Sequence, residues 1–184
     1  MRKLLLITGD LATGKSTFAH ILSKRYDTCL LVKDTVKEVL GDVLGASTNE
    51  ESKRLSLAAV EVMLYTFSSF TSLNKDLILE ANFHADELLK IQKMASESDY
   101  QVLTLVIRAD LETLHKRYLN RMHNEDRHPV HLSGMFEAFD DFKAYIERSR
   151  EESVPGDTIY IDANDFSYQI DEELLKKIEN FLMS

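Results

Sequence analysis

The sequence predicts an α/β fold with three layers, α/β/α, built around a five-stranded parallel sheet. Short apolar runs alternate with longer helical patterns, which is typical of strands joined by helices. The runs are continuously apolar, as expected for strands covered on both faces. With 184 residues and no linker or repeat, the chain fits one domain, 1–184. The expected strands are Leu4–Thr8, Cys29–Lys33, Leu77–Ala81, Val102–Ile107 and Thr158–Ile161.

Helical periodicity and capping signals fill the intervals between these strands. Residues 17–26 and 35–44 form the first two helices, and Gly45 suits the position just past the second. Either Ser47 with Glu50 or Thr48 with Glu51 forms a capping box for a helix running toward residue 73. The later helices are marked by Asp110 as an N-cap, by the apolar positions Met135, Phe139, Phe142 and Ile146, and by Asp171 as the cap of the last helix.

The helix over residues 55–73 has the length of a membrane span and contains one acid, Glu61. Serines and threonines are scattered through it, and strand-like segments lie on both sides. These features favour a buried or interface helix over a membrane span. We therefore expect no membrane association and consider a homodimer formed through this helix.

Composition limits the classes of partner. Lys and Arg total 22 and Asp and Glu total 31, so the formal charge is 22 − 31 = −9, which disfavours binding to a nucleic-acid backbone. The lone cysteine, Cys29, cannot form an internal disulfide, and the apolar run at the N-terminus is too short for a secretion signal. A cytoplasmic location is the expectation.

The strongest motif is the phosphate-loop pattern G-x-x-x-x-G-K-S at residues 9–16. It follows an apolar strand and opens a helix, so its backbone N–H groups can converge on phosphate oxygens. Lys15 would reach the β- and γ-phosphates, and the Ser16 hydroxyl would bind Mg²⁺. The expected nucleotide contacts are Gly9, Asp10, Leu11, Ala12, Thr13, Gly14, Lys15, Ser16 and Thr17.

The bound nucleotide is expected to be ATP. A GTPase needs an N-K-x-D motif after a late strand to read guanine, and the sequence has none. Small size without a second module favours a kinase over a motor or remodelling ATPase.

The chain resembles the small P-loop kinases that include zeta-toxin-like, chloramphenicol-phosphotransferase-like, gluconate-kinase-like and polynucleotide-kinase-like enzymes. Beyond the phosphate loop, three segments carry the resemblance: Lys33-Asp34-x-x-Lys37, residues 79–83, and the run of arginines at 117, 121 and 127. The resemblance implies a P-loop kinase fold with a short helical lid, about residues 117–133. It also implies that Asp34 is the base facing the acceptor hydroxyl, and that residues 161–165 pass around the adenine ring.

The residues themselves also support Asp34 in this role. It ends an expected strand beside the phosphate loop, at the sheet edge where α/β proteins bind ligands. A carboxylate there can accept the proton of an attacking hydroxyl. The alternative is that Asp34 caps the next helix, and the two roles are compatible. Lys37, one turn on, either contacts the acceptor or is solvated.

Glu80 closes the apolar run 77–79, where P-loop proteins usually have an acid. It would act on Mg²⁺ through water or bind the acceptor; a solvent-facing strand end is the alternative. Asn82 is a weaker candidate for acceptor binding, and His84 reads as the start of a helix.

Arg117 and Arg121 are four residues apart and share one helix face, and Arg127 follows a polar stretch. Guanidinium groups bind phosphate in a bidentate manner, so these side chains could clamp ATP and neutralise developing charge. We expect Arg121 and Arg127 to act in catalysis and Arg117 in nucleotide binding; a solvated, salt-bridged face is the alternative. The spacing of His123, His128 and His131 fits no zinc site.

The sequence therefore predicts an ATP-dependent phosphotransferase that acts on a hydroxyl of a small molecule. Between the second and third strands the only arginine is Arg54, which favours an uncharged acceptor over a nucleoside monophosphate. The alternatives are an ATP-binding regulatory or toxin-like module without efficient transfer, and a nucleotide or polynucleotide 5′-hydroxyl kinase.

Overall fold

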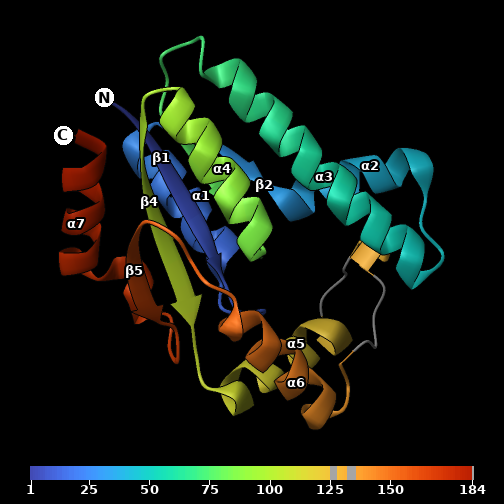
Figure 1. Ribbon diagram of the computed structural model, residues 1–184. Helices are drawn as coiled ribbons and strands as arrows, with labels where there is room; N and C mark the ends of the chain where they lie inside the picture. The colour runs from blue at the N-terminus through green and yellow to red at the C-terminus, as the bar shows by residue number, and fades with distance from the viewer. Residues whose placement is uncertain (125–127, 132–135, 184) are drawn as a thin grey trace.

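The computed structural model describes residues 1–124, 128–131 and 136–183. Five parallel strands form one sheet in the order β2-β3-β1-β4-β5, with helices on both faces (Figure 1). The strands are β1 (Arg2–Gly9), β2 (Cys29–Val32), β3 (Leu77–Glu80), β4 (Tyr100–Arg108) and β5 (Asp157–Asp162). The helices are α1 (Lys15–Tyr26), α2 (Lys33–Leu44), α3 (Asn49–Phe70), α4 (Ala85–Glu97), α5 (Leu111–Asn124), α6 (Phe139–Glu151) and α7 (Glu172–Met183), with 3₁₀ turns η1 (Pro129–His131) and η2 (Ser167–Ile170).

The predicted α/β/α layers and all five predicted strands are confirmed. The central strand β1 is buried from Lys3 to Thr8, as its unbroken apolar run indicated. The edge strands β2 and β5 are only partly buried, because each has a neighbour on one side alone. Register places Ile7 of β1 and Val32 of β2 on either side of Glu80 of β3.

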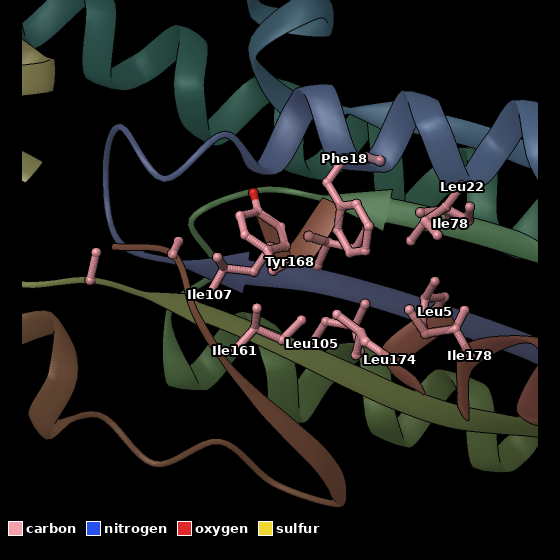
Figure 2. Close-up of a cluster of buried hydrophobic side chains, with 14 of the residues drawn as sticks. Leu5, Phe18, Leu22, Ile78, Leu105, Ile107, Ile161, Tyr168, Leu174 and Ile178 are labelled. Atoms are coloured by element: carbon pink, nitrogen blue, oxygen red, sulfur yellow. The ribbon is translucent and has the colours of Figure 1, made fainter. Parts of the chain in front are cut away.

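Two hydrophobic clusters cover the two faces of the sheet. One joins α1 and α7 to the sheet and continues to α5 and α6, and Figure 2 shows Phe18 edge-on to Tyr168 at its centre, with ring centroids 5.1 Å apart. The other packs α3 and α4 on the opposite face. Burial of these apolar faces is the main force that holds the helices on the sheet.

Two helix boundaries and one strand end differ from the expectations given above. The second helix begins at Lys33 with Val32 as its N-cap, so Asp34 lies in its first turn and the predicted capping role of Asp34 is wrong. The strand before it ends at Val32, because the chain turns directly from β2 into α2. The third helix ends at Phe70 instead of running to residue 73. A full helix, α4, follows His84, whose N–H donates to Glu87 at 2.9 Å, so His84 is the helix-start residue predicted.

The predicted helix over 55–73 is built into the core along one face. Its residues Leu55, Val60, Met63 and Phe67 are buried, and Tyr65 is exposed on the opposite face. Across the described ranges, none of the helices combines the length and apolarity that crossing a membrane requires.

The structure decides between the two capping boxes before α3. The hydroxyl of Thr48 accepts a hydrogen bond from the N–H of Glu51 at 3.2 Å, and the carboxylate of Glu51 accepts one from the N–H of Thr48 at 3.0 Å. Ser47 contributes only its backbone N–H, which donates to Glu51 at 2.7 Å.

We expect Thr48→Ala to lower the free energy of unfolding by about 1 kcal/mol, because it leaves the N–H of Glu51, in the first turn of α3, without its acceptor. Ser47→Ala is the matched control and should change stability by less than about 0.5 kcal/mol. Urea unfolding followed by circular dichroism measures both, and an equal loss in the two variants would contradict the assignment.

Candidate functional site

The phosphate loop joins β1 to α1 at the carboxyl edge of the sheet. Gly9 has a φ of 125°, and a Cβ at this position would lie 2.1 Å from the carbonyl oxygen of Ile107. Gly14 has a φ of 86° and precedes the first helical residue, Lys15. Both positions require glycine, so the loop can bend tightly and leave its inner surface open toward a ligand.

A cleft of about 930 Å³ opens beside this loop. Its wall contains most of the predicted site residues together with residues of α5 and η2. The wall consists of residues 11–17, Asp34, Glu80, Asn82, Thr113, Lys116, Arg117, Tyr118, Asn120, Arg121, Phe166 and Gln169.

Lys15 is buried at the base of the cleft, and its ammonium group donates to the carbonyl oxygen of Asp10 at 2.5 Å. Burial lowers the pKa of this lysine below its ordinary value, while Glu80, Asp34 and Asp10 act in the opposite direction. The ammonium is therefore held inside the curve of the loop by a single carbonyl and three nearby acids.

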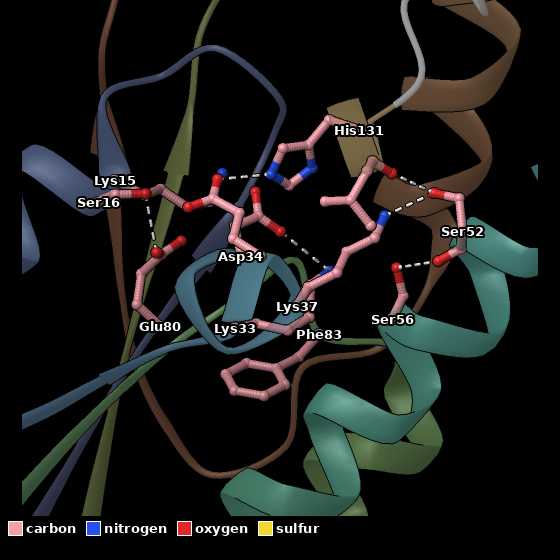
Figure 3. A network of polar contacts seen from close by, with 12 residues as sticks. Lys15, Ser16, Lys33, Asp34, Lys37, Ser52, Ser56, Glu80, Phe83 and His131 are labelled. Atoms are coloured by element: carbon pink, nitrogen blue, oxygen red, sulfur yellow. Dashed lines mark hydrogen bonds and ion pairs between the residues drawn. The ribbon is translucent and has the colours of Figure 1, made fainter. Parts of the chain in front are cut away.

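Ser16 and Glu80 connect the start of α1 to the end of β3. The Ser16 hydroxyl donates to a Glu80 carboxylate oxygen at 2.9 Å (Figure 3). Glu80 is 4% exposed, and burial raises its pKa, although Lys15 and the hydrogen bond from Ser16 act to lower it. The alternative of a solvent-facing strand end is wrong. A hydroxyl beside a carboxylate is the oxygen donor set that suits Mg²⁺, so these two residues fit the predicted metal site.

Asp34 lies in the first turn of α2, where β2 ends next to β3, and its side chain is 54% exposed. Figure 3 shows its carboxylate among Lys15, Lys33, Lys37 and His131. Burial acts to raise its pKa, but these four groups outweigh burial and hold the pKa below its usual value. Asp34 is therefore an ionised hydrogen-bond acceptor on the cleft wall near neutral pH.

Lys37 is neither solvated nor part of that wall. Its side chain is buried, and its ammonium donates to the Ser52 hydroxyl at 2.8 Å. Ser52 in turn donates to the carbonyl oxygen of Val130 at 2.8 Å. Lys37 and Ser52 thus link α2, α3 and η1. The charge of Lys37 also helps to lower the pKa of Asp34, although its ammonium is not on the cleft wall. Asn82 does line the cleft, half-buried, as predicted.

The turn η1 is anchored on α2, the helix that carries Asp34. Val130 is 2% exposed and packs on Gly41, where a Cβ would lie 2.8 Å from its Cγ2 atom. His131 pairs with Glu38 at 2.7 Å, and His128 pairs with Asp42 at 2.9 Å. In the parts of the chain that the structure describes, no three His, Cys, Asp or Glu side chains gather as a metal centre would require.

The predicted arginines divide into three cases. Arg117 and Arg121 lie on α5 and line the cleft, as their spacing indicated. Arg127 lies outside the described residues. Arg117 donates to the carbonyl oxygens of Ala163 at 2.6 Å and Asn164 at 2.9 Å, and it stacks 4.1 Å from the ring centroid of Phe166. It therefore holds the segment after β5 that was expected beside the adenine.

Asp10 was predicted to contact the nucleotide, but it does not line the cleft. Its N–H donates to the carbonyl oxygen of Ile107 at 2.9 Å, and its buried carboxylate is paired with Arg150 at 2.6 Å. Neither group faces the cleft, because both are used to fix the first turn of the loop. Arg150 carried no sequence signal, since it lies 140 residues from Asp10. Phe166 and Gln169 were also missed; they follow the last strand closely, which is the one available cue.

A phosphate loop after β1, an acid at the end of β3 and arginines on the helix after β4 define a member of the small P-loop kinase group. The sequence matches the AAA_33 family, described as an AAA domain, over residues 4–149, and the chain belongs to this family. Comparison with curated protein sequences gave no match.

Solved structures agree with this assignment. A protein from Chloroflexus aurantiacus J-10-fl described as a candidate kinase is 27% identical, with 98% of each chain covered and a TM-score of 0.84. A gluconokinase from Sinorhizobium meliloti 1021 is 12% identical, with 100% of this chain and 96% of that chain covered and a TM-score of 0.61. Shikimate kinase from Aquifex aeolicus VF5 is 15% identical, with 96% of each chain covered and a TM-score of 0.60. These last two similarities concern the fold.

The raised pKa of Glu80 predicts how stability depends on pH. A carboxyl whose pKa is higher in the folded than in the unfolded state contributes full stability below its unfolded pKa, and this contribution is lost as pH rises through its folded pKa. Glu80→Gln removes this titration. The variant should therefore gain in unfolding free energy relative to the wild type as pH rises from 4 to 8, by about 1.4 kcal/mol for each unit by which the pKa is raised.

Urea unfolding at several pH values measures this difference. Glu61→Gln, on the exposed face of α3, is the control and should show no such trend. A difference between Glu80→Gln and the wild type that stays constant with pH would contradict the assigned pKa direction.

Proposed function

We propose that this protein is an ATP-dependent phosphotransferase that moves the γ-phosphate of ATP to a hydroxyl of a small, uncharged acceptor. The observation that carries the proposal is the single cleft wall formed by Lys15, the Ser16–Glu80 pair and Asp34. It combines the groups that bind phosphates with a separate, half-exposed carboxylate that an acceptor can reach.

Each of these residues has a separate role in the proposed transfer. The N–H groups of the loop and the Lys15 ammonium bind the phosphate oxygens, with Arg121 approaching from α5, while Arg117 holds the segment beside the nucleotide. Ser16 and Glu80 would hold Mg²⁺, which neutralises phosphate charge during transfer when it is bound. Asp34 accepts the hydrogen of the acceptor hydroxyl and orients its oxygen toward the phosphorus atom.

The surroundings of Asp34 favour orientation as its main contribution. Its pKa is lowered, so the carboxylate is ionised but is a weaker base than a free one. Phosphoryl transfer has a loose transition state in which the hydroxyl needs little activation before attack. Holding the oxygen in line therefore contributes more than early removal of its proton.

The class of acceptor follows from the charges near Asp34. Lys37 donates to Ser52, His131 is paired with Glu38, and Lys33 lies 3.9 Å from the Asp34 carboxylate itself, so these groups are engaged within the protein. A phosphorylated acceptor would need cations free to bind it. The net charge of −9 argues in the same way against a polynucleotide.

A free, exposed thiol at Cys29 suits a reducing cytoplasm. A homodimer through residues 55–73 stays a prediction.

Asp34→Asn should lower acceptor-dependent ADP formation by about 10²- to 10⁴-fold and change the Kd for ATP by less than about threefold. The matched control is Asp86→Asn, which removes an exposed acid from the first turn of α4, as Asp34 lies in the first turn of α2. ADP release is measured with sugars, hydroxyl-bearing antibiotics, nucleosides and a 5′-hydroxyl oligonucleotide as acceptors.

Each outcome separates the candidate functions. Turnover with one acceptor that Asp34→Asn abolishes supports the proposal. Equal turnover of Asp34→Asn and wild type would reject Asp34 as the acceptor-facing residue. Thermal stabilisation by ATP with no turnover on any acceptor would favour a nucleotide-binding module, and turnover on the oligonucleotide alone would favour a polynucleotide kinase.

A further inference from the structure

An ion pair between the buried carboxylate of Asp10 and the partly buried guanidinium of Arg150 lies behind the phosphate loop. The guanidinium of Arg150 binds the carboxylate at both oxygens: Nε donates to Oδ1 at 3.2 Å and Nη2 to Oδ2 at 2.6 Å. The Asp10 side chain is 3% exposed, whereas that of Arg150 is 28% exposed. Arg150 also donates to the carbonyl oxygen of Ala109 at 2.5 Å, at the end of β4. The pair therefore joins the loop, the sheet edge and α6.

Asp10 is the residue that organises the loop. Its carbonyl oxygen accepts hydrogen bonds from the Lys15 ammonium at 2.5 Å and from the Thr13 hydroxyl at 3.1 Å. Its carboxylate also accepts one from the N–H of Ala109 at 3.3 Å. Any shift of Asp10 would move the group that holds the Lys15 ammonium. Arg150 thus acts on the phosphate-binding lysine through one intervening residue.

Charge makes the pair consequential for an anionic ligand. Without Arg150, a carboxylate shielded from solvent would lie in the first turn of a loop whose function is to bind phosphate. Such a charge would repel the phosphates and compete with them for Lys15, and little water reaches it to screen this effect. Removing one partner of a buried pair leaves a larger penalty than the pair itself contributes.

We propose that Arg150 is a positioning residue that makes the phosphate loop competent to bind ATP, by neutralising Asp10 and fixing its carbonyl oxygen beside Lys15. This proposal rests on the proposed function, because it assumes that the loop binds nucleotide. It adds a role for α6, the helix that follows η1 in the chain. The last turn of that helix would be part of the nucleotide site although it contacts no nucleotide.

The test measures ATP binding rather than transfer. Arg150→Met keeps the length of the side chain and removes its charge, and we expect it to raise the Kd for Mg-ATP at least about tenfold by calorimetry. Arg148→Met is the matched control on the same last turn of α6 and should change this Kd less than about twofold. Arg150→Lys should bind ATP more tightly than Arg150→Met, because it restores the charge.

The double variant Asp10→Asn/Arg150→Met separates charge neutralisation from general bracing. The neutral amide that replaces the Asp10 carboxylate leaves no unpaired charge, so the double variant should recover at least about fivefold in ATP affinity over Arg150→Met. A double variant that binds as weakly as Arg150→Met, or more weakly, would overturn the proposal. Unchanged ATP affinity in Arg150→Met would also overturn it. If wild-type protein binds no ATP, the proposed function fails instead, and the two failures are distinct.

Discussion

The site depends on the order of three parallel strands. With β1 between β3 and β4, and β2 outside β3, the carboxyl ends of β1, β3 and β2 lie next to one another. The register aligns Glu80 with Ile7 on one side and Val32 on the other. The phosphate loop, the buried acid and Asp34 are therefore neighbours, although they are tens of residues apart in the chain. The Ser16–Glu80 hydrogen bond closes this arrangement by tying the helix after the first strand to the third.

Burial shifts the pKa values of the two charged side chains at the base of the cleft. Lys15 and Glu80 are both buried, and burial moves their pKa values in opposite directions, each toward the neutral form. Their mutual attraction opposes that trend, together with Asp34 and Asp10 at Lys15 and the hydrogen bond from Ser16 at Glu80. A phosphate oxygen near Lys15, or a cation near Glu80, would add an opposite charge that stabilises the ionised form of that side chain. The buried carboxylate of Asp10 is instead paired with Arg150 inside the protein.

The turn η1 is connected to α2, the helix that carries Asp34. The turn η1 docks on α2 and α3 through Val130, and this contact needs a glycine at position 41. Lys37 and His131, which belong to this contact, also contribute to the low pKa of Asp34. The position of η1 and the ionisation of Asp34 are thus coupled through the same side chains. Arg150 forms the corresponding connection on the nucleotide side, from α6 to the loop.

Local sequence patterns determined the five strands, most helices and the phosphate loop, because strand burial, helix capping and glycine requirements act over a few residues. They also placed Glu80, Asp34 and two arginines on the cleft, since each follows a strand or shares a helix face. Only the tertiary structure showed that the side chains of Asp10 and Lys37 bind other parts of the protein and do not line the cleft. Their partners, Arg150 and Ser52, lie 140 and 15 residues away, and no spacing rule connects them. These pairs form only when the helices and strands pack together. They determine which polar side chains remain on the cleft wall to contact a ligand.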